Sequence, residues 1–492
     1  MAIIVLPPGS TAADLQNAIN GAGFEDIIEI SNNITFTGNV IIPAGGSLTI
    51  RSNTVNNWVL TQTIPNVRHF VVNGSLILQN ITLDGGIIGG GIQVNSGANL
   101  TINAGTIILN CNGNFGGGVN VGNGATFTMY GGLINDNFSP LAGAGVFVDS
   151  GVFIMWDGTI SGNNVTFQGG GVGLTNSASF TMHGGMIRGN TAGIGAGVHV
   201  RSDSTFIMWD GTISGNEASI RGGGVAVIGS NSSFTMNGGT IGGSNKAGSL
   251  GGGVSVEEDA IFTMSDGSII SNVASIGGGI ALLEGIVDMN GSIIADNDAP
   301  IGGGVAIGSH NSVSVFNMNS GEITNNTASN GGGVYVHPMG SFLMIGGAIN
   351  SNTAHNGGGI YNAGSVVDIS GTAEITNNTA TYNGNGQGGG IYTTDFNLLT
   401  ITGPGVRFAN NRADFATNRD PANDAVYATN ILNMESNWTV PFIQGYNNFD
   451  INQRGPKIEP EPEDDCLKII LLFLMMVCRP KKKCCCKDDC KC

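Results

Sequence analysis

The stretch Gly169–Ala192, GGGVGLTNSASFTMHGGMIRGNTA, decides the fold of this chain because its parts recur along the 492 residues. Its glycine triplet, GGG or the variant GAG, ends at twelve positions that lie 25 to 31 residues apart, namely 91, 118, 145, 171, 197, 224, 253, 279, 304, 333, 359 and 390. A Phe-x-Met pattern follows roughly ten residues later, starting at Phe127, Phe153, Phe180, Phe206, Phe234, Phe262, Phe316 and Phe342. Asn-x-Ala comes next, starting at Asn190, Asn216, Asn245, Asn272, Asn297, Asn326, Asn352 and Asn378. Repeats of this length indicate a solenoid.

Within one unit the apolar residues alternate with period two, as Val-x-Val and Phe-x-Met, before a lone isoleucine. This is the spacing of β-strands whose apolar side chains all point the same way. A unit of three such short strands cannot bury its apolar side alone, whereas stacking units in register gives every strand a parallel partner. The sequence therefore predicts an all-β fold, a parallel β-helix with about one coil per repeat. The recurring asparagine is expected to point inward at a turn, as a ladder of amides.

The chain outside the regular repeats of about 89–390 is expected to complete the rod. Thr11 to Asp14 resembles a capping box, with Leu15 and Ile19 on one helical face. This predicts a short helix within an N-terminal cap, residues 1–24, that covers the open end of the first coil. The β-helix is assigned to residues 25–397, and its C-terminal coils and cap to 398–453. Residues 454–465 are interpreted as an acidic, proline-containing linker, and 466–492 as an unstructured tail with an apolar run and many cysteines and lysines.

The charge of the chain restricts its partners. The formal net charge is −17, and a single lysine, Lys246, precedes residue 457. Such an acidic body repels phosphate backbones, so we expect no binding of nucleic acid. The N-terminus, MAIIVLPPGSTAADLQ, has no basic segment and only a short apolar run, so we expect no classical signal peptide there. The sequence suggests no cofactor and no metal site in the repeats.

Units of the form GGGV…FTM.GG.I..N.A resemble the repeats of bacterial and archaeal adhesin-like surface proteins, and they are similar to the repeats of the polymorphic outer-membrane proteins. The resemblance covers roughly Gly89 to Gly390, and FTMHGGMIRGNTAGIGAGVHV (Phe180–Val200) shows it well. It implies a right-handed parallel β-helix that is displayed on a surface for adhesion or as a stalk. The export signals of those families are not visible in this sequence, so their export route is not carried over.

An exposed aromatic stripe is predicted on the outside of the rod. The residue after each inward methionine should face solvent, and in four successive units it is Tyr130, Trp156, His183 and Trp209. Asp157 and Asp210 lie beside it. Such a stripe suits glycans, because sugar rings pack their C–H faces on aromatic rings and their hydroxyls bind carboxylates. The other interpretation is an aromatic ladder that only stabilises adjacent strands.

Cleavage of polysaccharides is the alternative function, because many β-helix proteins are lyases or hydrolases. Glycoside hydrolysis needs two positioned carboxylates, and a lyase needs a base. In the repeats the acids are scattered, and the run Glu257–Asp259 is expected in a loop after a first strand. The histidines stand at different repeat positions, at His69, His183, His199, His310, His337 and His355. We therefore assign no catalytic residue; a phage tail-spike-like polysaccharide lyase or hydrolase stays the alternative.

The tail contains seven of the eight cysteines, Cys466, Cys478, Cys484, Cys485, Cys486, Cys490 and Cys492. Its apolar run, Ile469–Val477, is too short for a transmembrane helix. One interpretation is cross-linking to other coat or surface proteins or to another copy, because an odd number of thiols favours bonds between chains. A second is membrane contact through residues 467–483, where lysines attract anionic lipid and acylated cysteines add a second anchor. Metal binding is the third, although the cysteine spacing fits no zinc pattern well.

The sequence as a whole favours a non-enzymatic structural or adhesive rod that is attached or cross-linked through its C-terminal tail. Its expected location is the external surface of a bacterial cell or spore. A spore coat fits a chain that is made without a leader and then fixed by cysteines on a particle. The alternative location is the cytoplasmic face of a membrane.

Overall fold

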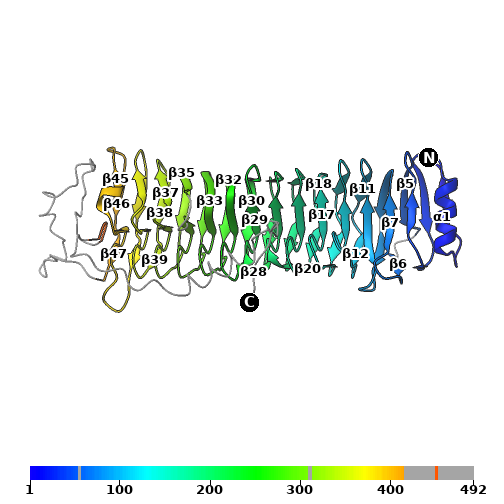
Figure 1. The fold of residues 1–492 in the computed structure, drawn as a ribbon, viewed down its shortest axis with the longest axis horizontal. Helices are drawn as coiled ribbons and strands as arrows, with labels where there is room; N and C mark the ends of the chain where they lie inside the picture. The colour runs from blue at the N-terminus through cyan, green and yellow to red at the C-terminus, as the bar shows by residue number, and fades with distance from the viewer. Residues whose placement is uncertain (54–56, 309–312, 415–448, 453–492) are drawn as a thin grey trace, which may run out of the picture. The chain divides into compact units, whose positions relative to one another are not determined.

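The computed structural model describes residues 1–53, 57–308, 313–414 and 449–452. Its unit Met1–Asn452 is an elongated stack of coils, with the helix α1 (Ala12–Gly21) at one end (Figure 1). The stack has about 14 turns, and each strand pairs in parallel with the strands one coil before and after it. The predicted all-β fold, a parallel β-helix, is confirmed.

The first ladder of parallel strands contains the Val-x-Val segments that follow the glycine triplets. Its register matches equivalent repeat positions, for example Val172 with Val198, and both of these side chains are fully buried. The ladder consists of β4 (Val40–Ile42), β7 (Arg68–Val72), β10 (Gly90–Val94), β13 (Val119–Val121), β17 (Val146–Asp149), β21 (Val172–Thr175), β25 (Val198–Arg201), β29 (Val225–Ile228), β34 (Val305–Ile307), β36 (Val334–Val336), β40 (Ile360–Asn362) and β44 (Ile391–Thr393).

The second ladder contains the Phe-x-Met segments, whose phenylalanines and methionines fill the core. The rings from Phe127 to Phe262 stack from coil to coil with centroids 4.6 to 4.8 Å apart and nearly parallel planes. Phe180 and Met182 are fully buried, like their partners in neighbouring coils. The ladder consists of β1 (Ile3–Val5), β2 (Asp26–Ile30), β5 (Ser47–Ser52), β8 (Ser75–Gln79), β11 (Asn99–Ile102), β14 (Thr126–Met129), β18 (Val152–Met155), β22 (Ser179–Met182), β26 (Thr205–Met208), β37 (Gly340–Met344), β41 (Val366–Ile369) and β45 (Leu399–Ile401).

The third ladder holds the lone isoleucine of each unit, such as the fully buried Ile187. It consists of β3 (Ile34–Phe36), β6 (Trp58–Gln62), β9 (Ile81–Asp84), β12 (Ile107–Leu109), β15 (Leu133–Asn135), β19 (Thr159–Ser161), β23 (Met186–Arg188), β27 (Thr212–Ser214), β38 (Ala348–Asn350), β42 (Glu374–Thr376) and β46 (Arg407–Ala409). In the middle of the rod pairing continues around the corners. Four longer strands therefore run through two or three ladders, namely β30 (Ser233–Gly242), β32 (Val254–Ile270), β33 (Ile280–Ala295) and β35 (Ser314–Thr324).

A fourth ladder of very short strands was not predicted, because two-residue strands carry no alternation to detect. It forms separate sheets from β16 (Phe138–Ser139), β20 (Asn164–Val165), β24 (Thr191–Ile194), β28 (Glu217–Arg221) and β31 (Lys246–Ala247), and from β39 (Thr353–Ala354), β43 (Thr379–Ala380) and β47 (Arg412–Ala413). Its alanines, such as Ala192 and Ala218, join Val165 in a second small core beside the glycine triplets. The alanine of Asn-x-Ala therefore has a packing role.

The glycine triplets recur because successive coils approach closely there. Gly169 has a φ of +69°, which glycine adopts without strain. A Cβ on Gly171 would lie 2.7 Å from the carbonyl oxygen of Gly197 in the next coil. A larger residue at the third triplet position would force neighbouring coils apart.

The asparagine ladder is confirmed as a buried column that runs the length of the repeats. Asn190 Nδ2 donates to Asn216 Oδ1 at 2.9 Å and to the carbonyl of Ile160 at 3.1 Å, and its backbone N–H donates to the same Oδ1. The column also includes three members that the Asn-x-Ala list omitted, Asn137, Asn163 and Asn411. It starts at the backbone N–H of Cys111, which donates to Asn137, and reaches Asp450, which accepts from Asn411. Burial raises the pKa of this final Asp450 to about 6.

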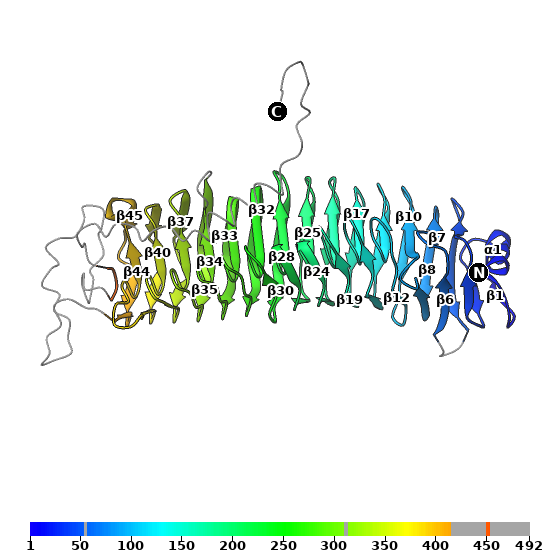
Figure 2. The same ribbon diagram turned by 60° about the horizontal axis from the view of Figure 1, so that its bottom comes forward.

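The predicted N-terminal helix is confirmed as α1, which closes the end of the stack in Figure 2. The Thr11 side chain accepts from the backbone N–H of Asp14, and the Asp14 carboxylate accepts from the backbone N–H of Thr11 at 2.8 Å. This is the reciprocal capping box. Leu15 and Ile19 are buried against the first coils. Strand β1 precedes the helix and pairs with β2, so the stack already begins at Ile3.

At the other end, β44 to β47 and the 3-10 turn η1 (Phe396–Leu398) continue the coils, and Ile451 pairs in parallel with Ile391. The proposed linker, 454–465, and the tail, 466–492, lie outside the described residues.

Candidate functional site

The structure places the predicted aromatic stripe at the end of the second ladder, on the outside of the rod. Tyr130, Trp156 and Trp209 are 55%, 47% and 52% exposed, and His183 is half-buried. The rings of Tyr130 and Trp156 have centroids 6.4 Å apart with planes 12° apart. Those of Trp156 and His183 lie 4.0 Å apart, 11° from parallel. In-register strands thus present neighbouring rings as one platform.

The two carboxylates of the stripe stand at the corner between the second and third ladders. Asp157 and Asp210 are exposed, and each accepts a 2.7 Å hydrogen bond from the backbone N–H of the following glycine. This bond orients each carboxylate next to its tryptophan. One coil separates them, and there Gly184 takes the equivalent position, so the surface between the two acids carries no side chain.

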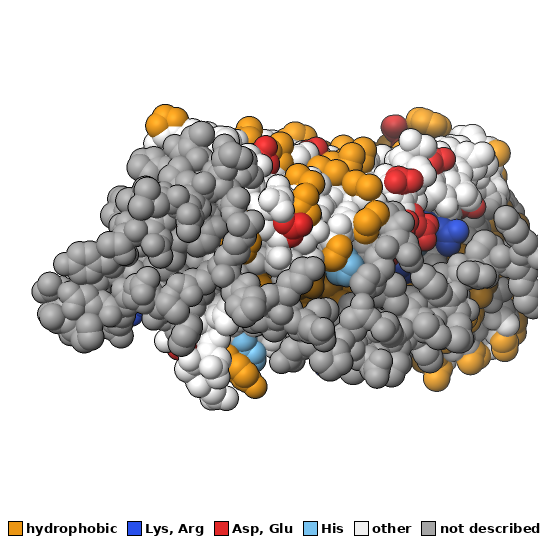
Figure 3. Space-filling view, turned by 60° about the vertical axis from the view of Figure 1, so that its left-hand side comes forward, with side chains coloured by type: hydrophobic (Ala, Val, Ile, Leu, Met, Phe, Trp, Pro, Cys, Tyr) orange, Lys and Arg blue, Asp and Glu red, His pale blue; other side chains and the backbone are white. Residues whose placement is uncertain are grey.

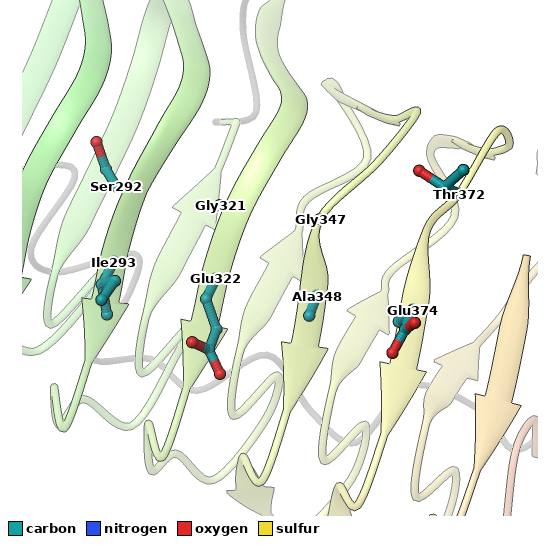
Figure 4. Close-up of a pocket in the computed structure, with 8 residues that line it drawn as sticks. All are labelled: Ser292, Ile293, Gly321, Glu322, Gly347, Ala348, Thr372 and Glu374. Carbon is teal, nitrogen blue, oxygen red and sulfur yellow. The ribbon is translucent and has the colours of Figure 1, made fainter.

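A shallow groove lies farther along the same corner and was not predicted. Its volume is about 570 Å³, and it crosses four coils. Figure 4 shows Ile293, Glu322, Ala348 and Glu374 side by side on successive strands of the third ladder. Ser292, Gly321, Gly347 and Thr372 complete its lining. On the face shown in Figure 3, exposed hydrophobic and acidic side chains likewise lie next to one another.

The two glutamates of the groove are held by neighbours. Asn350 Nδ2 donates to Oε1 of Glu322 at 2.6 Å, and Arg407 Nη1 donates to Oε2 of Glu374 at 3.2 Å. Ala348 stands between them in the register. The repeat period is the signal that could have predicted this pair, because Glu322, Ala348 and Glu374 are 26 residues apart and hold the same position in three successive units.

Several other polar groups are buried and have structural roles. Glu257 pairs with Arg221 and accepts from Ser255 Oγ at 2.5 Å. The expectation of a loop for Glu257–Asp259 is wrong, because these residues lie within β32: Glu257 pairs with Leu283, and Glu258 and Asp259, with φ of +56° and +64°, form a bulge between the first and second ladders. Burial lowers the pKa of His69 to about 4 and that of His199 to about 3, so both imidazoles are neutral at neutral pH.

In the part of the chain that the structure describes, no three histidine, cysteine, aspartate or glutamate side chains lie close enough to hold a metal ion. No helix in the described ranges is long and apolar enough to cross a membrane. The tail cysteines, Cys466, Cys478, Cys484, Cys485, Cys486, Cys490 and Cys492, and the membrane-contact segment 467–483 lie outside the described residues.

Comparisons with protein-family models, with curated proteins and with solved structures gave no match to this chain. The structure shows a β-solenoid repeat protein, and the resemblance to adhesin-like repeats rests on the repeat residues alone.

Proposed function

We propose that this chain is a non-enzymatic structural or adhesive rod on the external surface of a bacterial cell or spore, and that its aromatic stripe binds surface glycans. The supporting observation is the register of Tyr130, Trp156 and His183, whose rings stack as an exposed platform with Asp157 beside it. Flat rings on a continuous parallel sheet are preorganised, so little side-chain entropy is lost when a sugar packs on them.

The arrangement of acids favours this rod over a polysaccharide-cleaving enzyme, which is the alternative. The larger groove is lined by Glu322 and Glu374, and the smaller hollow near β20 by Glu217 alone. Two coil spacings separate Glu322 from Glu374, roughly 10 Å, which is at the long limit for the carboxylates of an inverting glycosidase. A catalytic groove that also binds a cation would be expected to contain at least three acidic side chains. Among the described residues, neither hollow contains three.

Replacing both tryptophans, Trp156→Ala with Trp209→Ala, should weaken glycan binding at least tenfold without changing the fold. Each lost ring removes a stacking surface whose loss costs roughly 1 kcal/mol or more. The measurement is a glycan array followed by calorimetric titration of the best ligand, with circular dichroism as the test of folding. Phe167→Ala is the matched control, because Phe167 is 57% exposed but lies outside the stripe. Unchanged affinity in the double variant would contradict the glycan proposal.

We further propose that the tail attaches the rod through disulfide bonds to coat or surface proteins or to another copy. The protein from its native source should then run as a ladder on a denaturing gel and collapse to about 50 kDa with reductant, its mass being 50.2 kDa. Cys111 is not expected to contribute, because burial raises its pKa to about 12 and shields the thiol. Replacing Cys111 with serine should leave the ladder intact.

A single monomer band in both lanes would rule out cross-linking by the tail. The alternative, attachment at the cytoplasmic face of a membrane, would then predict acyl groups on Cys484 to Cys486, which mass spectrometry of the C-terminal peptide detects.

A further inference from the structure

The groove of the third ladder is a second site, distinct from the aromatic stripe. Ile293, Glu322, Ala348 and Glu374 occupy the same position in four successive coils, with side chains on the outside of the rod. Ala348 projects only a methyl group, so a gap lies between the two glutamates. Gly321 and Gly347 leave the adjoining corner without side chains. The result is a trough that crosses the coils, about 14 Å long at ~4.8 Å per coil.

The charge in this trough is incompletely neutralised. Glu374 pairs with Arg407, whereas Glu322 accepts from the neutral amide of Asn350. Within the described part of the chain Glu322 forms no ion pair. A positioned carboxylate without a cation attracts a ligand that carries a positive charge, and Asn350 fixes where that charge would sit.

Ser292 is a second, independent sign of a ligand. Ser292 is one of the lining residues and is 9% exposed; its hydroxyl oxygen is buried from solvent and has no hydrogen-bond partner among the described residues. The corresponding corner in the next two coils is glycine, at Gly321 and Gly347, with φ of +100° and +83°. Ser292 keeps a φ of +78° in spite of its Cβ. A strained, unpaired hydroxyl is destabilising on its own, and a ligand in the groove would compensate for it once the Ser292 side chain rotates toward that ligand.

We propose that this groove binds an amino sugar, as a unit of an oligosaccharide that lies along the rod. The ammonium group pairs with Glu322, and sugar hydroxyls bond to Glu374, Thr372 and, after a turn of its side chain, Ser292. The apolar face of a ring packs on Ile293, which is 43% exposed. The groove volume of about 570 Å³ accommodates a few rings, within the usual range for ligand sites.

The test uses the full chain and two soluble probes, the tetramer of glucosamine and the tetramer of N-acetylglucosamine. Acetylation removes the ammonium charge and keeps the rings. We expect the glucosamine tetramer to bind at least tenfold more tightly, and Glu322→Gln to abolish that preference. Glu217→Gln is the control, because it removes one negative charge from an exposed glutamate paired with Lys246 at another site. It should leave the preference unchanged.

Ser292→Gly separates binding from folding. Glycine relieves the positive φ, so the midpoint of unfolding should stay the same or rise while affinity for the glucosamine tetramer falls several-fold. Equal binding of the two tetramers, or equal effects of Glu322→Gln and Glu217→Gln, would overturn the proposal. New reducing ends during incubation would also overturn it, in favour of a catalytic groove. The stripe proposal is judged separately, because Trp156→Ala with Trp209→Ala should not change the preference between the two tetramers.

Discussion

Asn272→Asp should destabilise the rod by at least about 3 kcal/mol at neutral pH, although the two side chains have the same shape. Asn272 Nδ2 donates to the carbonyl of Ile241 and to Oδ1 of Asn297, both at 3.0 Å, in a fully buried column. An oxygen in its place would face two acceptors and carry a buried charge. Unfolding in denaturant, followed by circular dichroism, measures the loss.

The destabilisation should shrink as the pH falls. A buried carboxyl has a folded-state pKa above its unfolded value, so the folded state holds the proton more tightly and gains stability below the folded-state pKa. Asp450 at the end of the same column shows this environment, because burial raises its pKa to about 6. The comparison at each pH is with the parent protein, since the buried His69 adds its own acid sensitivity. Asn319→Asp is the control: Asn319 is exposed and donates to Asn290, so its replacement should cost less than about 0.5 kcal/mol. Equal effects at positions 272 and 319 would show that the column does not stabilise the fold.

Phe206→Ala should cost about 4 kcal/mol, because it leaves a cavity in the centre of the phenylalanine stack. Phe206 is fully buried, with ring centroids 4.7 Å from both Phe180 and Phe234. The loss of two stacked ring pairs adds to the free-energy cost of removing the buried ring and of leaving a cavity. In a solenoid each coil contacts only its neighbours, so a weak coil in the middle can also split the unfolding transition into two. Thermal unfolding by calorimetry shows both effects.

Ile207→Thr is the matched control for this prediction. Ile207 follows Phe206 in the same strand, points outward, and is paired with Thr181 and Thr235 in the neighbouring coils. Threonine at position 207 should therefore change stability by less than about 0.5 kcal/mol. A loss below about 1 kcal/mol for Phe206→Ala would mean that the coils collapse around the missing ring.

The stripe and the groove lie along one edge of the rod, the corner between the second and third ladders. Trp156 and Trp209 are in its first half, and Glu322 and Glu374 are in its second half. The two proposals thus concern different chemistry along the same corner of the rod. In its first half, ring faces would bind neutral sugars, and in its second half, a carboxylate would bind an amine. Testing the two pairs of residues separately, as above, shows whether one ligand contacts both.

The sequence by itself determined the parallel solenoid, the inward asparagine column, the capping box of α1 and the outward position of the aromatic stripe. Each of these depends on residues that recur in every unit or lie within a few positions of one another, so periodicity and spacing are sufficient. Trp156 could be placed outside the rod from its position after the inward Met155, and Asn190 inside from its recurrence at the turn of each unit.

Only the tertiary structure decided the fourth ladder, the burial of Glu257 and the groove at Glu322 and Glu374. The strands of the fourth ladder are as short as two residues, and Glu257 is buried through contact with Arg221, which lies 36 residues away. The groove depends on what stands next to each glutamate one coil away, Ala348 in the gap and Gly321 at the corner. The positions follow the repeat period, but the residues at these positions differ from unit to unit, so the recurring motif does not include them and the shape of the groove emerges only when the coils are stacked.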